Sequence, residues 1–101
     1  MQQRIKMAHT TIIKADTAIY SDGESILGCD MSGLPADLHA LQWDGSKGHI
    51  EWTVPTKANT ELTASSQIKT HLGISLSDIT SRHTARKTEL ENEPAIFEKL
   101  G

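Results

Sequence analysis

The chain has 101 residues, and its 10 basic and 13 acidic side chains give a formal net charge of −3. Such a balance provides no broad positive field, which argues against nucleic acid as the main partner. Apolar residues make up 37% of the chain and aromatic residues only 4%. This composition predicts a single domain over residues 1–101 with a modest core, and small domains of this kind are often completed by oligomerisation, so we expect a homo-oligomer.

Membrane and export signals are not expected. The apolar stretches are only a few residues long, and the segment Thr11–Ile13 is closed by Lys14. A bilayer span needs about 20 consecutive apolar residues. Cys29 is the only cysteine, so no disulfide can form within the chain. A lone thiol fits synthesis in a reducing cytosol, where it behaves as a small apolar residue.

Residues 10–54 are predicted to form a β-rich part of the domain that begins with a hairpin. The segments Thr10–Ile13 and Thr17–Tyr20 are rich in β-branched and aromatic residues, which favours strands. Ser21–Gly23 supplies turn chemistry before Ser25–Leu27, so a hairpin is predicted there. Residues 28–37 contain two glycines and a proline and are interpreted as a loop.

A second hairpin is predicted from Leu38–Trp43 and His49–Val54, joined by the turn residues 44–48. Period-two alternation brings the large apolar side chains of both segments to one face. These side chains are Leu41, Trp43, Ile50, Trp52 and Val54. Core packing is the preferred interpretation for Trp43 and Trp52, and the alternation allows the two indoles to pack against each other across the strands. The alternative is an exposed aromatic platform for carbohydrate or peptide.

Residues 60–100 are predicted to be helical, which makes the fold class α+β: a small N-terminal antiparallel sheet of about four strands followed by two or three C-terminal helices. One short helix is expected over Thr60–Leu72, with Gly73 as its left-handed cap. A longer helix, capped by Ser75 or Ser77, is expected to reach about Asn92. The pair Glu93-Pro94 favours a restart, in which Ile96, Phe97 and Leu100 dock.

The longer helix carries a stripe at spacings of three and four that we interpret as a contact with a neighbouring subunit. Its residues are Leu76, Ile79, His83, Arg86 and Leu90. The basic cluster over residues 82–87 lies close in sequence to several glutamates, and the competing interpretation is a solvated, ion-paired face.

No catalytic, metal or cofactor-binding residue is predicted. The five histidines are His9, His39, His49, His71 and His83, and none lies three or four positions from another, as helical ligand pairs do. Only His39 and His49 are expected to approach each other, across the second hairpin and near Asp37 or Glu51. Neither a G-x-S-x-G elbow nor a phosphate-binding glycine loop is present, so we expect no enzyme.

A resemblance adds a functional expectation. The sequence LPADLHALQWDGSKGHIEW over residues 34–52 resembles a segment of small tailed-bacteriophage proteins that are described as structural, tail-associated or uncharacterised. The segments Tyr20–Gly23 and Met31–Gly33 also resemble these phage proteins, whereas the sequence from Ala64 onward does not. The resemblance implies a non-enzymatic virion protein of the tail, tail fibre or baseplate, made in the bacterial host cytoplasm and bound to other virion proteins.

Two alternatives belong to different functional classes. One is a phage assembly chaperone or adaptor that is absent from the mature particle. The other is a head decoration protein, which would be present in hundreds of copies. Presence in purified particles and copy number would separate these alternatives from a tail component.

Overall fold

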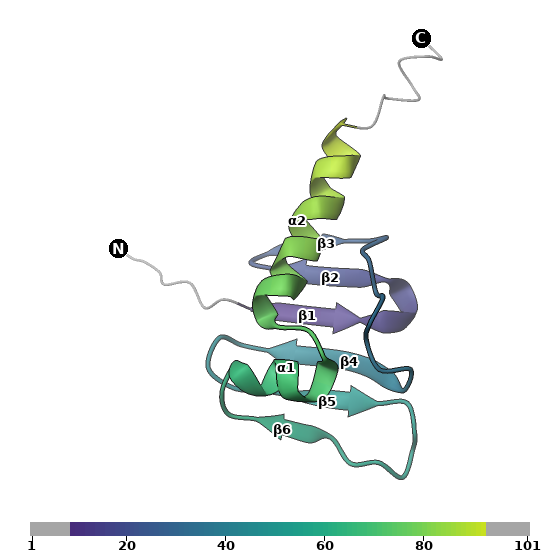
Figure 1. The fold of residues 1–101 in the computed structure, drawn as a ribbon, viewed down its shortest axis with the longest axis vertical. Coiled ribbons are helices and arrows are strands. Elements are labelled where there is room, and N and C mark those ends of the chain that lie inside the picture. The colour runs from purple at the N-terminus through teal and green to yellow at the C-terminus, as the bar shows by residue number, and fades with distance from the viewer. Residues whose placement is uncertain (1–8, 93–101) are drawn as a thin grey trace.

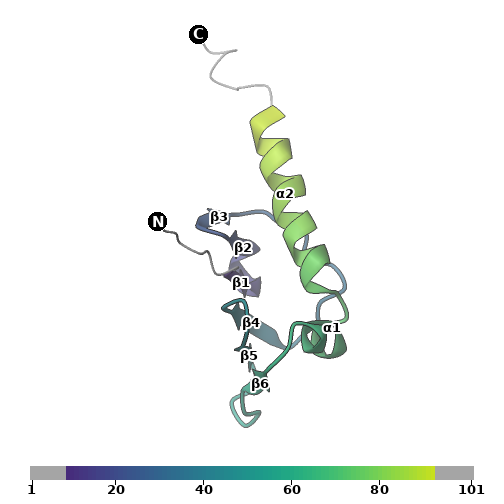
Figure 2. The same cartoon turned by 90° about the vertical axis from the view of Figure 1, so that its left-hand side faces the viewer.

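The chain forms one antiparallel sheet with both helices packed on one of its faces (Figures 1 and 2). The computed structural model describes residues 9–92. The strands are β1 (Thr10–Ile13), β2 (Ala18–Ser21), β3 (Glu24–Ile26), β4 (Leu38–Trp43), β5 (Gly48–Trp52) and β6 (Thr60–Leu62). The helices are η1 (Lys14–Asp16, a 3-10 turn), α1 (Ser66–Leu72) and α2 (Leu76–Asn92). The predicted α+β fold, with an N-terminal sheet followed by helices, is confirmed.

The strand order β3-β2-β1-β4-β5-β6 places β1 and β4 at the centre of the sheet. β1, β2 and β3 form a meander, and the chain then returns so that β4 pairs with the free side of β1. The β2–β3 hairpin turns through Asp22 and Gly23, which both have positive φ, 48° and 94°. Two such residues are what a type I′ turn requires, so the predicted turn chemistry is confirmed.

A β-bulge in β4 sets which side chains reach the core. Leu38 pairs with Trp52 whereas Ala40 pairs with the adjacent Glu51, so His39 is an extra residue in the ladder. Strict alternation would put Leu38 and Leu41, three positions apart, on opposite faces. The bulge corrects this phase, and both leucines are buried, at 2% and 0% exposure.

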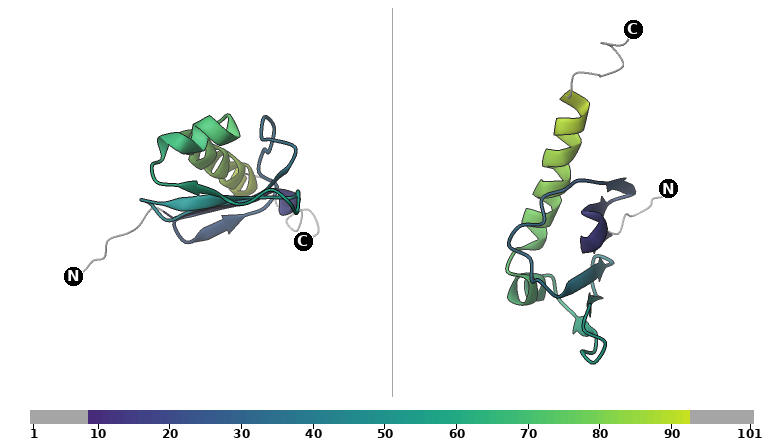
Figure 3. Two further views of the ribbon diagram at one scale, coloured as in Figure 1. Left: turned by 90° about the horizontal axis from the view of Figure 1, so that it is seen from below. Right: turned by 90° about the vertical axis from the view of Figure 1, so that its right-hand side faces the viewer.

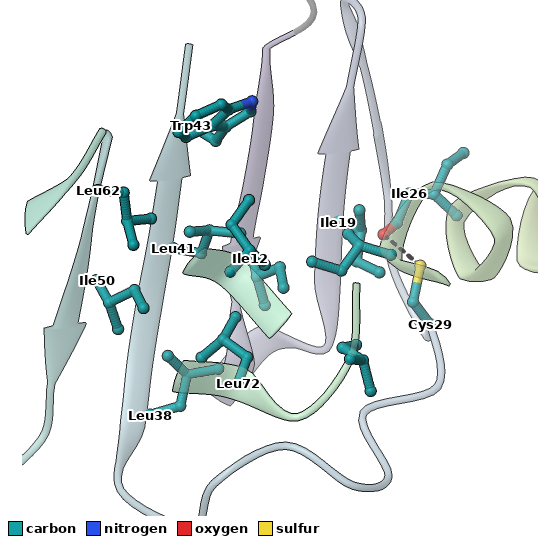
Figure 4. Packing of buried hydrophobic residues seen from close by; sticks show 13 residues of the cluster. Ile12, Ile19, Ile26, Cys29, Leu38, Leu41, Trp43, Ile50, Leu62 and Leu72 are labelled. Atoms are coloured by element: carbon teal, nitrogen blue, oxygen red, sulfur yellow. Dashed lines mark hydrogen bonds between the residues drawn. The ribbon is translucent and has the colours of Figure 1, made fainter. Parts of the chain in front are cut away.

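The core lies between the sheet and the helices (Figure 4). The registers place Ile19, Ile12, Leu41 and Ile50 side by side across four neighbouring strands. Isoleucine and leucine at these positions form a continuous apolar layer for the helices to cover. The helices and the segment between them contribute Ile68, Leu72, Ile74 and Ile79.

Local signals define the helix ends. α1 stops at Gly73, where φ is 83° and the amide donates to the Lys69 carbonyl, as predicted for a left-handed cap. For α2, the Asp78 amide donates to Ser75 Oγ at 3.1 Å, and the Ser75 amide donates to Asp78 Oδ2 at 3.4 Å. This reciprocal pair makes Ser75 the cap, in preference to Ser77.

Four expectations need correction or fall outside the described residues. The sheet has six strands, not about four, and the segment predicted to start a helix at Thr60 forms β6 instead. β6 is short and its conformation is set by pairing with β5, in which Leu62 lies opposite Gly48 and is buried. Val54 follows the end of β5 and is 41% exposed. The predicted restart with Ile96, Phe97 and Leu100 lies outside residues 9–92.

Candidate binding surface on the open face of the sheet

Both helices lie on the same side of the sheet (Figure 3). Within residues 9–92, neither α1 nor α2 covers the opposite face, and we call it the open face. Strand registers align one row of side chains across five strands of this face, from β2 to β6. This polar row consists of Tyr20, Thr11, Gln42, His49 and Glu61. With neighbouring strands about 4.8 Å apart, the row is roughly 19 Å long.

A shallow groove of about 600 Å³ lies along the polar row. All five residues of the row line it, and the β4–β5 turn contributes Asp44 and Lys47 at one end. Tyr20, Thr11, Gln42 and His49 are half-buried, and Glu61 is exposed. The volume falls within the range of about 300–1,000 Å³ that is usual for small-molecule sites.

The side chains of the groove are partly fixed by their neighbours. Thr11 Oγ1 donates to Gln42 Oε1 at 3.1 Å, so the amide NH₂ of Gln42 points away from Thr11. At the turn, Asp44 accepts from the amides of Lys47 and Ser46 at 2.8 and 2.9 Å. These two amides hold the pKa of Asp44 below its ordinary value. The turn end of the groove therefore carries a stable carboxylate beside the Lys47 ammonium.

Glu51 lies between two histidines on the same face. Its carboxylate is 2.9 Å from His49 Nε2 and 4.0 Å from His39 Nε2. The bulge places His39 there, so the expected approach of the two histidines near Glu51 is confirmed, whereas Asp37 pairs with Lys57 instead, at 2.9 Å. Even so, no group of three His, Cys, Asp or Glu side chains in the described part of the chain is arranged to hold a metal ion.

The two tryptophans do not pack against each other across the hairpin. Trp43 pairs with Gly48 at one end of the β4–β5 ladder, and Trp52 pairs with Leu38 at the other. Both residues face the helices, but the length of the hairpin separates them. The indole packing that the alternation allows therefore does not occur, because alternation fixes the face of a residue and leaves its cross-strand neighbour undefined.

The surroundings of the two indoles also differ. Trp43 is 4% exposed and belongs to the core. Trp52 is half-buried at the edge of the core, and its Nε1 donates to Thr60 Oγ1 at 3.0 Å. Lys57 Nζ lies 3.7 Å from the centroid of the Trp52 ring. The Lys57 ammonium thus already covers the ring of Trp52. Trp43 is too buried to form the exposed aromatic platform that was the alternative interpretation.

The predicted interaction stripe on α2 mainly serves the chain's own packing. Ile79 is fully buried and His83 is 6% exposed, and His83 Nε2 donates to the Glu24 carbonyl at 2.9 Å. Leu76 is half-buried against the core. These residues face inward because the helix buries its apolar side on the sheet. The predicted contact of Ile79 and His83 with a neighbouring subunit is therefore wrong.

The rest of the stripe lies farther along α2. Arg86 Nε donates to the Leu27 carbonyl at 3.1 Å, which ties the helix to the β3–β4 loop. Leu90 is 40% exposed. Near them, Lys87 pairs with Glu24 at 2.8 Å, and this pairing lowers the pKa of Glu24. The basic cluster thus includes an ion-paired side chain and a loop anchor.

Cys29 is a packing residue of the hydrophobic core. Its side chain is 4% exposed, and Sγ donates to the Ile26 carbonyl at 3.3 Å (Figure 4). Burial raises the pKa of the thiol, so the nucleophilic thiolate is disfavoured.

The polar row was not predicted from the sequence. Its members come from five separate strands, so only the strand order brings them together. No helix among residues 9–92 is long and apolar enough to cross a bilayer. Comparisons of the chain with protein-family models, with curated proteins and with solved structures find no match.

Proposed function

We propose that this chain is a non-enzymatic structural component of a tailed-bacteriophage particle, in the tail, tail fibre or baseplate, that acts through contacts with other virion proteins and with copies of itself. The resemblance of residues 34–52 supplies the phage context. The open face of the sheet is the observation that carries the binding role.

The open face suits a subunit that is completed by partners. A sheet usually buries one face on its own helices, and its second face remains available to solvent or to another protein. Next to the polar row lie Ile13, Ala18 and Ala40, which the registers bring together on adjacent strands of the same face. Ile13 remains half-buried. Ala18 and Ala40 are buried, at 8% and 1% exposure, so Ile13 is the accessible apolar side chain beside the polar row, and such a mixture of apolar and polar groups is typical of protein interfaces.

The residue chemistry also favours binding over catalysis. The only thiol is buried with a raised pKa. His49 and His83 bond to the Glu51 carboxylate and the Glu24 carbonyl, instead of to a hydroxyl or thiol nucleophile. An activated nucleophile needs a base within hydrogen-bond reach. The described histidine contacts therefore serve structure.

The proposal is tested in the phage that encodes the chain. Mass spectrometry of purified particles is expected to find the chain at a few to a few dozen copies per particle. Ile13→Arg should abolish incorporation, because it replaces the accessible apolar side chain of the open face with a charge. The matched control is Thr88→Arg on the exposed side of α2, and circular dichroism confirms that both variants fold.

The other outcomes separate the alternatives. Absence from purified particles, with retention in infected-cell extracts, would replace the proposal by an assembly chaperone or adaptor. Hundreds of copies that co-purify with heads would replace it by a decoration protein. Normal incorporation of folded Ile13→Arg would show that the open face is not the interface.

A further inference from the structure

We propose that the groove along the polar row binds a short neutral oligosaccharide. The inference concerns a ligand site on the isolated chain and does not depend on the particle role proposed above. Three properties of the groove carry it: its position in the sheet, the chemistry of its side chains, and its charge.

The position of the groove disfavours an extended peptide. A peptide strand adds to a sheet edge, where unpaired backbone groups form a ladder with it. The polar row instead crosses the middle of the sheet, from β2 through β1, β4 and β5 to β6. Each inner strand there is paired on both sides, so its backbone groups are already used. A ligand that lies across these inner strands must therefore be recognised by their side chains, and only β6, at the end of the row, is an edge strand.

The side chains suit a molecule with many hydroxyl groups. Tyr20 offers an aromatic ring, which can pack against the C–H face of a sugar ring. Gln42, held by Thr11 Oγ1 through its amide oxygen, presents its N–H donors, and Glu61 presents acceptor oxygens at the other end of the row. A sugar hydroxyl both donates and accepts, and Gln42 and Glu61 lie two strands apart, so the hydroxyls of neighbouring linked rings can satisfy the donor and the acceptor.

The charge of the groove argues for a neutral ligand. The acidic, basic and histidine side chains that line it are Asp44, Lys47, Glu61, His9 and His49, and counting histidine as neutral leaves a formal charge of −1. The opposite charges of Asp44 and Lys47 lie in one turn and offset each other, and Asp44 already accepts the turn amides. Glu61 forms no ion pair with any residue in the ranges described, 9–92. The lining therefore carries a small formal negative charge, which repels acidic sugars and favours a neutral ligand.

The size of the groove sets the length of the ligand. A volume of about 600 Å³ lies in the middle of the range for small-molecule sites. The groove is open and the row is roughly 19 Å long. These dimensions fit a few linked sugar rings that lie flat on the sheet, with weak affinity because much of the ligand stays in solvent.

The test is an NMR titration of the ¹⁵N-labelled full chain with four neutral trisaccharides, built from glucose, galactose, mannose or N-acetylglucosamine. Concentrations up to about 10 mM detect dissociation constants in the millimolar range. At least one trisaccharide is expected to give saturable shifts centred on the amides of Thr11, Gln42, His49 and Glu61. Sialyllactose and an unstructured peptide serve as the acidic and peptide ligands, and both are expected to bind more weakly.

Two variants locate the site. Glu61→Gln removes the charged acceptor with little change in shape and is expected to weaken binding about tenfold. Tyr20→Leu keeps an apolar side chain but removes the ring, and it is expected to weaken binding severalfold. Glu91→Gln on α2 is the matched control and should leave binding unchanged. The spectrum of each variant reports whether it folds.

The proposal is overturned by any of three results with folded protein. The first is the absence of saturable shifts with all four neutral trisaccharides. The second is a response that maps outside the groove or survives both Glu61→Gln and Tyr20→Leu. The third is stronger binding of the peptide or of sialyllactose, which would assign the groove to another class of ligand.

Discussion

Trp43→Ala is expected to remove a large part of the stability of the domain. The indole is 4% exposed, and burying about 200 Å² of aromatic surface at about 25 cal/mol/Å² corresponds to about 5 kcal/mol. The buried alanine side chain retains a small part of this burial free energy, and the cavity left by the indole destabilises the fold further. Substitutions of buried Trp by Ala cost about 3–5 kcal/mol, so we expect the free energy of unfolding to fall by about 4 kcal/mol. That is a large fraction of the ~5–15 kcal/mol typical of a small domain.

Trp52→Ala is the matched comparison, because it is the same substitution at the opposite end of the same hairpin. Trp52 is half-buried and contributes a hydrogen bond to Thr60 and a cation–π contact with Lys57. These contacts are worth about 1 kcal/mol each or less. With partial burial added, we expect a loss of about 2 kcal/mol, half of that for Trp43.

Both losses are measured by urea unfolding followed by far-ultraviolet circular dichroism, since each substitution removes half of the tryptophan fluorescence. The midpoint should drop for both variants with an unchanged slope. The reasoning is refuted by equal losses, or by a larger loss for Trp52→Ala. Either result would mean that the indole with the solvated edge carries as much of the packing as the buried one.

Three further outcomes follow from local geometry. Gly48→Ala should lower the free energy of unfolding by about 2 kcal/mol or more, because an added Cβ would lie 2.0 Å from the Gln42 carbonyl oxygen; wild-type urea stability of Gly48→Ala would contradict this. The amides of Lys47 and Ser46 lower the pKa of Asp44 below its ordinary value of 3.8. The Asp44 carboxylate therefore stabilises the folded chain fully above pH 3.8, and this stabilisation is lost as the pH falls through the lowered pKa. An NMR titration that places the Asp44 pKa at or above 3.8 would exclude the effect. Cys29 should react with a disulfide reagent only at the rate of unfolding, because its thiol is buried with a raised pKa; rapid labelling of the native chain would refute its burial.

Much of the fold could be predicted from sequence because its signals are local. The turn at Asp22-Gly23, the helix stop at Gly73 and the cap at Ser75 each depend on a few neighbouring residues. The same holds for the two hairpins. β6 was missed because three residues carry no periodicity, and its conformation comes from pairing with β5. The α2 stripe shows a related limit: the pattern identifies an apolar side, but packing decides whether that side faces the chain's own sheet or a neighbour.

The groove was beyond sequence reasoning for a further physical reason. A cross-strand row exists only when both the order of the strands and their registers are known, and each register depends on features that alternation does not reveal. The bulge at His39 shows how little is needed to change the result. If His39 were paired as an ordinary strand residue, without the bulge, the part of β4 before Ala40 would shift by one position relative to β5, and Leu38 would turn from the core to the open face. The core and the polar row are thus fixed by the same registers, so the hydrophobic demand of one face also positions the side chains that a ligand would meet on the other.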